Sequence, residues 1–202
     1  MKKLYIFILS VAITVTAFLM SVSAAQTTHT VVKGETMWKI AVKYEIGLSE
    51  IKSANMHVKN PDLIYPGDKL YIPEHDSSVT AYEQEVVRLV NIERNKQGLK
   101  SLDSDWQLSR VARYKSQDMK DKGYFSHTSP TYGSPFEMMK NFGISYRTAG
   151  ENIAKGQRTP AEVVKAWMNS SGHRANILSS SFTKIGVGYV KDGNYWTQMF
   201  IG

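Results

Sequence analysis

The chain has 202 residues, enough for one or two domains with cores of ordinary size, and its 42% hydrophobic and 21% charged residues indicate a globular rather than a disordered protein. The absence of cysteine excludes disulfides, thiolate metal sites and thiol chemistry. The formal charge is +7, but no basic run is interleaved with aromatic residues, so nucleic acid is not an expected partner.

The N-terminal segment predicts export. Lys2 and Lys3 precede an apolar run from Leu4 to Met20, and the small residues of SVSAAQ follow it. These are the three parts of a secretory signal peptide, so we expect residues 1–25 to be removed after one of the two alanines. An uncleaved membrane anchor is the alternative, because the run is nearly long enough to span a bilayer. Cleavage removes two lysines, leaving a positive mature chain without a stable membrane span and suited to anionic wall polymers.

Residues 28–73 have the pattern of a small β-α-α-β unit. A β-type run at Thr30–Val32 leads through a turn into one helix, and Ser49 is expected to cap a second helix. A turn-rich loop and a closing strand follow, with Leu70 and Ile72 on one face of that strand. The two strands of such a unit can pair antiparallel, with both helices on one face.

Two stretches of this unit, VVKGETMWKIAVKY and NPDLIYPGDKLYIP, resemble a LysM domain, most closely the LysM repeats of Bacillus-type spore-coat and wall proteins. In that family two loops flank a groove that holds N-acetylglucosamine-containing chains of peptidoglycan or chitin, largely through backbone groups. The resemblance assigns this groove to Gly34, Glu35, Thr36 and Met37 in the first loop and to Pro61, Asp62, Leu63 and Ile64 in the second. Helical spacing, by contrast, predicts that the Trp38 side chain belongs to the core.

Residues 74–81 are polar and are expected to form a short linker to a second domain, residues 82–202. Charged side chains on its helices, Lys115 and Glu83 among them, are expected to be solvated. Asp192-Gly193 marks a terminal β-hairpin, so the domain is predicted to be mixed and layered. Apolar spacing and end signals predict three helices: one with Val86, Leu89 and Val90 that ends near Gly98, one from Asp103 or Ser104 to Lys122-Gly123, and one with Thr159 as cap and Pro160 at its first position.

Three titratable residues of this domain are candidates for a shared site: His127 in GYFSHTSP, Glu151 in AGENIA and His173 in NSSGHRANIL. All three are expected in turn-rich, glycine-flanked segments. Two imidazoles and a carboxylate are sufficient for an open zinc-type site or for an acid–base pair. Their separation along the chain is too long for spacing alone to show proximity.

A purely structural interpretation of these segments competes with the site. Ser170 or Ser171 would cap the next turn, Arg174 would reach a carbonyl or carboxylate, and Asn176 would bind the backbone. Glu151 would then only tie two loops together.

The four motifs GYFSHTSP, AGENIA, AWMNSSGHRANIL and IGVGYV…YWTQMF resemble the CAP superfamily of cysteine-rich secretory and pathogenesis-related proteins, in its bacterial SCP-like branch, over residues 82–202. The resemblance implies an α-β-α sandwich whose cleft is lined by His127, Glu151 and His173, with a divalent metal, zinc above all, on the two histidines. Ser170 stands where eukaryotic members often have a glutamate, which weakens any mechanism that needs two carboxylates. A Ser-His-Glu hydrolase is disfavoured, since no serine lies in a G-x-S-x-G pattern.

Together these features predict an α+β protein of two domains, secreted to the cell wall or to spore surface layers and anchored to peptidoglycan by LysM. The CAP cleft is expected to bind a metal or ligand in a binding or regulatory role, and other wall or spore-coat proteins are further candidate partners. One alternative is a metal-dependent hydrolase of protein or wall peptide. Another is a lipid or small-molecule binder, for which an apolar groove at Met138, Met139 and Phe142 is the weak hint, since these side chains also suit a core.

Overall fold

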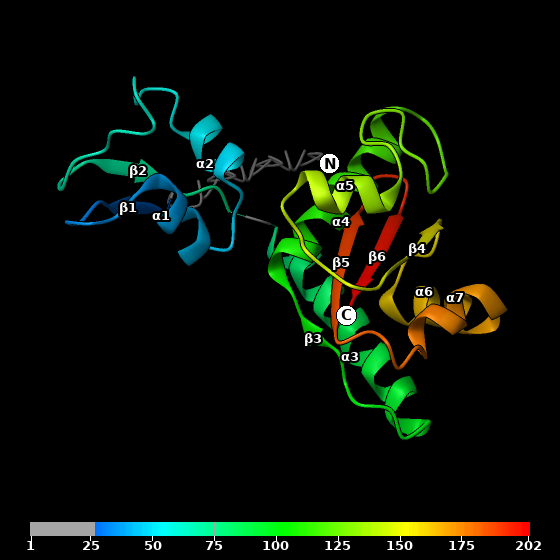
Figure 1. The fold of residues 1–202 in the computed structure, drawn as a ribbon. Helices are drawn as coiled ribbons and strands as arrows, with labels where there is room; N and C mark the ends of the chain where they lie inside the picture. The colour runs from blue at the N-terminus through cyan, green and yellow to red at the C-terminus, as the bar shows by residue number, and fades with distance from the viewer. Residues whose placement is uncertain (1–26, 75) are drawn as a thin grey trace, which may run out of the picture.

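The computed structural model describes residues 27–74 and 76–202, so the expected signal peptide, residues 1–25, lies outside the described residues. Figure 1 shows a small N-terminal unit, coloured blue to teal, and a larger C-terminal unit. Within the described ranges, every helix is too short or too polar to cross a membrane.

The N-terminal unit is the expected β-α-α-β arrangement. Its elements are β1 (Thr28–Thr30), α1 (Met37–Lys43), α2 (Leu48–Ala54) and β2 (Lys69–Tyr71). The two strands pair antiparallel, with His29 opposite Leu70. Ile40, Ile51 and Leu70 are fully buried and form the centre of the core, which confirms that Leu70 faces inward.

Three local expectations in this unit are wrong. The first strand ends at Thr30, before most of the expected run at Thr30–Val32. Gly47, not Ser49, is the N-cap of α2, because the Glu50 carboxylate accepts the Gly47 N–H and closes the first turn. Trp38 is 49% exposed, since Met37 and Ile40 take the inward positions of α1.

The C-terminal unit begins earlier than expected. The first helix, α3 (Ser77–Lys96), starts inside the segment expected to be a linker, capped by the Asp76 carboxylate. Residues Asp103–Ser104 form a short strand, β3, rather than a helix start, and α4 (Trp106–Asp121) begins after its cap Asp105. Asp105 N–H donates to the Ile185 carbonyl, which extends the strand pairing up to the cap.

The remaining elements include the predicted helix at Thr159 and the predicted hairpin, together with two helices and a strand that the sequence pattern did not predict. They are α5 (Pro135–Asn141), β4 (Ala149–Lys155), α6 (Pro160–Asn169), α7 (Ser171–Ile177), β5 (Lys184–Val190) and β6 (Tyr195–Ile201). The Thr159 hydroxyl caps α6 and Pro160 takes its first position, as predicted. The hairpin joins Val190 to Tyr195 across a turn in which Gly193 and Asn194 both adopt positive φ.

The sheet has the strand order β3-β5-β6-β4, with β3 parallel to β5 and the other pairs antiparallel. Helices α3, α6 and α7 cover one face and α4 and α5 the other, which confirms the α-β-α sandwich (Figure 1). Met138 and Met139 are buried in the α4–α5 side of the core and form no open groove.

Helix α4 lies unusually close to β5. A Cβ at Gly186 would meet the Leu108 carbonyl carbon at 2.3 Å, and one at Gly188 would meet the Arg113 nitrogen at 2.1 Å. The two glycines of IGVGYV therefore allow the backbone of the helix to lie directly on the strand. This close approach fixes α4, whose inner face supports the candidate site.

The two units contact one another through Arg110 of α4. Its Nε lies 3.1 Å from the Glu50 carboxylate of α2, and its guanidinium packs over the rings of Tyr114 and Phe142. The pair is largely buried, so it is desolvated more than an ordinary surface ion pair. The short connection expected between the domains is consistent with this contact.

Candidate functional site

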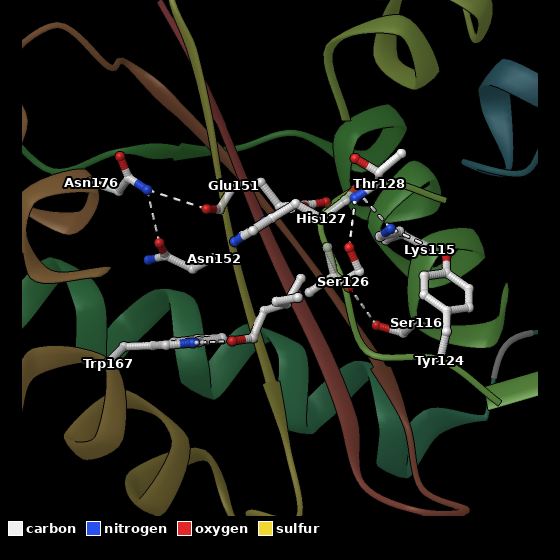
Figure 2. Close-up of polar contacts among 12 residues, drawn as sticks. Lys115, Ser116, Tyr124, Ser126, His127, Thr128, Glu151, Asn152, Trp167 and Asn176 are labelled. Atoms are coloured by element: carbon white, nitrogen blue, oxygen red, sulfur yellow. Dashed lines mark hydrogen bonds and ion pairs between the residues drawn. The ribbon is translucent and has the colours of Figure 1, made fainter. Parts of the chain in front are cut away.

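The centre of the candidate site is a contact between His127 and Glu151. His127 lies in the loop between α4 and α5, and Glu151 lies on β4 rather than in the turn-rich segment expected for it. The His127 Nδ1 is 2.7 Å from Glu151 Oε1 (Figure 2). The carboxylate is buried, whereas the imidazole is about half exposed. The buried Glu151 carboxylate therefore holds the His127 ring in a position where part of the ring is open to solvent.

His173 reaches the same region from α7, where it is the third helical residue and not part of a turn. Two amides tie α7 to β4: Asn152 Nδ2 donates to the His173 carbonyl at 3.1 Å, and Asn176 Nδ2 donates to the Glu151 carbonyl at 3.2 Å. Burial lowers the pKa of His173, and the charge of His127 lowers it further. The two amide bonds place α7 beside the part of β4 that carries Glu151.

The His127–Glu151 contact changes the pKa of both groups. The hydrogen bond to Glu151 raises the pKa of His127 above its ordinary value, against burial and the charge of Lys115. Burial raises the pKa of Glu151, and the hydrogen bond from His127 opposes that rise. A carboxylate partner selects the tautomer with hydrogen on Nδ1, which leaves the Nε2 lone pair of His127 available to a ligand.

Lys115 corrects the expectation that the charged residues of α4 are solvated. It is only 1% exposed, and its Nζ donates to the His127 carbonyl at 2.9 Å and to the Tyr124 hydroxyl at 3.1 Å (Figure 2). Burial lowers the pKa of Lys115, while the charges of Glu151 and Asp118 raise it. Lys115 therefore holds the backbone of the loop at the residue that carries the imidazole.

Asp118, one helical turn further along α4, anchors the same loop. Its Oδ2 accepts hydrogen bonds from the hydroxyls of Tyr124 and Ser129, both at 2.6 Å, and its Oδ1 accepts one from Thr131 at 2.5 Å. Sequence reasoning missed both anchors. The signal was present, because Lys115 and Asp118 are three residues apart on the helix and therefore project from one face.

Glu83 is a second charged residue that is buried against expectation. Its carboxylate receives the Arg113 guanidinium at 2.5 Å and the Tyr189 N–H at 3.0 Å. This pair joins α3, α4 and β5. Its function is structural.

The structural interpretation of the NSSGHRANIL segment is also correct in part. Arg174 donates to the Met168 carbonyl at 2.9 Å, and Asn176 binds backbone as described. Ser170 lies between α6 and α7 but makes no side-chain cap hydrogen bond. Among the described residues, no serine hydroxyl is hydrogen-bonded to either candidate imidazole, and the Ser126 oxygen instead accepts the Thr128 N–H.

The side chains of this site could offer a metal ion two nitrogen ligands, one from each histidine. Within the described part of the chain, no group of three or more His, Cys, Asp and Glu side chains is placed to hold a metal. His127 Nε2 and His173 would supply two imidazole ligands, with Glu151 orienting the first through Nδ1. The buried Glu151 Oε2 has no hydrogen-bond partner among the described residues and is one further acceptor. Such a set leaves several coordination positions to water or to a ligand.

The eight expected groove residues of the N-terminal unit have different environments. Met37 is buried in the core, so its side chain is not a groove contact. Glu35 accepts the Val32 N–H at 2.9 Å and contacts the His29 ring at 2.7 Å, and Thr36 caps α1. These side chains shape the first loop, while Leu63 in the second loop is open to solvent.

Family models match both units of the chain. The model of the cysteine-rich secretory protein family, CAP, matches residues 87–200, more than half of the chain. The chain belongs to the CAP family. A LysM model matches residues 29–73, so the chain carries a LysM domain followed by a CAP domain.

Each of three curated relatives matches part of the chain. The uncharacterized protein YkwD of Bacillus subtilis is 73% identical over 126 residues, 62% of this chain and 49% of the relative. SpoIVD-associated factor A of the same organism is 49% identical over 45 residues, 22% of this chain and 12% of the relative. The N-acetylmuramoyl-L-alanine amidase sle1 of Staphylococcus epidermidis is 35% identical over 81 residues, 40% of this chain and 24% of the relative. The chain thus spans half or less of the length of these relatives.

Solved structures support the CAP fold. An extracellular protein containing an SCP domain from Bacillus anthracis superposes with a TM-score of 0.59 at 35% identity, covering 67% of this chain and 47% of that one. An outer surface protein of Borrelia burgdorferi has a TM-score of 0.55 at 23% identity, covering 58% of this chain and 90% of that one, and shows the fold alone. LysM and CAP domains with such relatives point to an extracellular or cell-wall location.

Proposed function

We propose that this protein is secreted, binds peptidoglycan through its LysM domain and presents the CAP cleft there as a binding site for a divalent metal, zinc first, or a small ligand. The observation that carries the cleft assignment is that the buried Glu151 carboxylate holds the Nδ1 side of His127, while its Nε2 has no hydrogen-bond partner among the described residues. The role is binding or regulatory, in the wall or in spore surface layers, with other wall or coat proteins as candidate partners.

The LysM match supports the glycan assignment. Two relatives that share part of this chain are named for related settings, an N-acetylmuramoyl-L-alanine amidase and a SpoIVD-associated factor. The positive charge of the chain agrees with a wall rich in anionic polymers.

Chemistry in the cleft supports binding over turnover. A two-carboxylate mechanism needs an acid and a base of separate pKa, and Ser170 stands where the second acid would be expected. With zinc bound, the cleft would gain a Lewis acid. The chain itself contributes an imidazole at His127 that is oriented by the buried carboxylate of Glu151. It also contributes the imidazole of His173, and burial favours the neutral form of that ring by lowering its pKa.

Retention on insoluble peptidoglycan tests the anchor. The full mature chain should sediment with the polymer, and soluble N-acetylglucosamine oligomers should release it. Failure to sediment, or sedimentation that the oligomers do not reduce, would show that the LysM domain is not the anchor.

Zinc titration calorimetry at about pH 8, chosen above the ordinary imidazole pKa because Glu151 raises the pKa of His127, tests the cleft. One zinc should bind the full chain, and His127→Ala with His173→Ala should abolish the heat. His57→Ala is the matched control, because His57 is an exposed histidine of the LysM domain and its loss should leave zinc binding intact. Equal binding by the double variant would place the metal elsewhere.

A metal-dependent hydrolase is the second candidate, because the unpartnered Oε2 of buried Glu151 could act as a base toward water. Turnover of purified peptidoglycan or of casein that disappears in Glu151→Gln would favour it. No turnover of either substrate by the zinc-loaded protein would favour binding.

A further inference from the structure

The LysM domain has a surface depression beside β2 that is lined by exposed tyrosines, here called the aromatic hollow. Tyr65 is 57% exposed and Tyr71 is 39% exposed, and both line a depression of about 590 Å³ together with Leu63. The His57 ring meets the Tyr71 ring edge-on, at 5.4 Å between centroids. Exposed tyrosines that gather around one hollow are a feature of binding surfaces rather than of ordinary protein surface.

The hollow is distinct from the groove expected between the two loops. Of the eight groove residues, Leu63 alone lines it, and none of residues 34–37 contributes to it. Its floor includes the outer face of β2, where Lys69 and Tyr71 are exposed and Leu70 between them points into the core. The hollow therefore lies on the side of the second loop that continues onto the sheet.

The surface around the hollow is held rigidly. The side chain of buried Asn55 bonds to both the N–H and the carbonyl of Tyr71, each at 2.7 Å. The Tyr65 N–H donates to the Asp68 carboxylate at 2.8 Å, and the Gly67 N–H donates to the Val31 carbonyl at 2.9 Å. A surface fixed in this way loses little conformational entropy when a ligand binds.

The chemistry of the hollow selects its ligand. Tyrosine rings offer flat apolar faces for the C–H faces of pyranose rings, and Asn60 adds a polar side chain at the edge. Lys59 and Lys69 also line it, and within the described residues neither forms an ion pair. Asp68 is the one carboxylate among the lining residues, and it accepts the Tyr65 N–H. Two ammonium groups against one carboxylate leave the hollow positive beside its two rings, which suits a sugar polymer that carries carboxylates.

We propose that this hollow is a second glycan-binding face of the LysM domain and that it takes an amino-sugar strand bearing carboxylates, as peptidoglycan does, in preference to neutral chitin. The proposal rests on the proposed binding of peptidoglycan. Tyr65 and Tyr71 stack on the sugar rings, and Lys59 and Lys69 set the preference for the charged strand.

Binding of soluble ligands to the full chain tests this assignment. The probes are a neutral N-acetylglucosamine pentamer and a peptidoglycan glycan strand with free lactyl carboxylates, each followed by amide chemical shifts. Tyr65→Ala with Tyr71→Ala should reduce the affinity for the charged strand by about tenfold for each ring removed. Tyr65→Phe with Tyr71→Phe should retain binding, because stacking needs the ring and not the hydroxyl.

Lysine variants test the preference. Lys59→Gln with Lys69→Gln should reduce affinity for the charged strand by about threefold per lysine and remove most of its salt dependence, while the neutral pentamer binds unchanged. Phe136→Ala in the CAP domain is the matched control, since Phe136 is an exposed aromatic outside the hollow. Unchanged melting temperatures would show that the variants are folded.

The outcomes separate this inference from the anchor itself. If both ligands shift only the amides of residues 34–37 and 61–64, and the tyrosine variant binds as tightly as the unmodified chain, the second face is refuted while the anchor stands. If neither ligand binds and the chain does not sediment with peptidoglycan, both assignments fail. Shifts centred on residues 57–60 and 65–71 would establish the second face.

Discussion

Replacing Asp118 by asparagine tests whether α4 anchors the loop that carries His127. The substitution keeps the shape of the side chain but removes its charge and one of its two acceptor oxygens. In the structure that carboxylate accepts three hydroxyl donors, from Tyr124, Ser129 and Thr131. The Ser129 oxygen in turn accepts the N–H groups of Thr131 and Tyr132, both at 2.9 Å, so the whole turn depends on one side chain.

The expected loss follows from these bonds. A hydrogen bond to a charged group contributes about 1.5–3 kcal/mol and a neutral one about 0.5–1.5 kcal/mol. The asparagine amide would retain neutral bonds on one oxygen and leave at least one hydroxyl without its acceptor. The free energy of unfolding should therefore fall by about 2–4 kcal/mol. Asp121→Asn, a change on the exposed side of the same helix, should cost less than about 0.5 kcal/mol.

The pH dependence gives an independent check. Burial alone would raise the pKa of Asp118, but the donors Ser129, Thr131 and Tyr124 and the charge of Lys115 outweigh it and lower that pKa below its ordinary value. A carboxyl with a lowered pKa stabilises the fold above its unfolded pKa and loses this contribution as the pH falls through its folded pKa. The difference between the unmodified chain and Asp118→Asn should thus be constant from about pH 7 to about pH 5 and shrink below about pH 4.

Urea unfolding followed by tryptophan fluorescence, at neutral pH and across this pH series, measures both effects. Hydrogen exchange at the Thr131 and Tyr132 amides should accelerate in the variant if the turn loosens. A stability within about 0.5 kcal/mol of the unmodified chain at neutral pH, or a difference that grows toward low pH, would refute the anchoring role of Asp118.

Three further predictions concern the site and its support. In Glu151→Gln the pKa of His127, measured by NMR titration, should fall, because the charged acceptor that raises it is gone; an unchanged value would contradict the assigned pair. Lys115→Met should raise that same pKa by removing a nearby positive charge, and a fall would contradict the observed geometry. Gly188→Ala should lower the free energy of unfolding by at least about 3 kcal/mol, since its Cβ would overlap the backbone of α4. Gly172→Ala is the control and should be neutral or slightly stabilising, because the space around Gly172 is open. Equal effects of the two substitutions would argue against close packing of α4 on β5.

Much of the local structure could be predicted from the sequence. Thr159 and Pro160 mark the start of α6, and Asp192-Gly193 marks the hairpin, because caps and tight turns depend on a few neighbouring residues. The order of helices and hairpin also predicted a mixed, layered domain, and the family resemblance implied the α-β-α sandwich. Predictions of burial failed where the environment of a side chain depends on the packing of the whole domain. Trp38 was predicted to be buried, but it is exposed because its neighbours fill the core of a very small domain.

The candidate site shows the same division. The sequence by itself determined the two domains, the family resemblance and the identity of His127, Glu151 and His173 as candidates. Tertiary structure alone decided that Glu151 is buried against His127, and that Lys115 belongs to the support of the site. The physical reason is that burial and pairing of charges depend on what folds over them. A charged residue on a helix is normally solvated. Lys115 is buried only because the loop that carries His127 packs across α4.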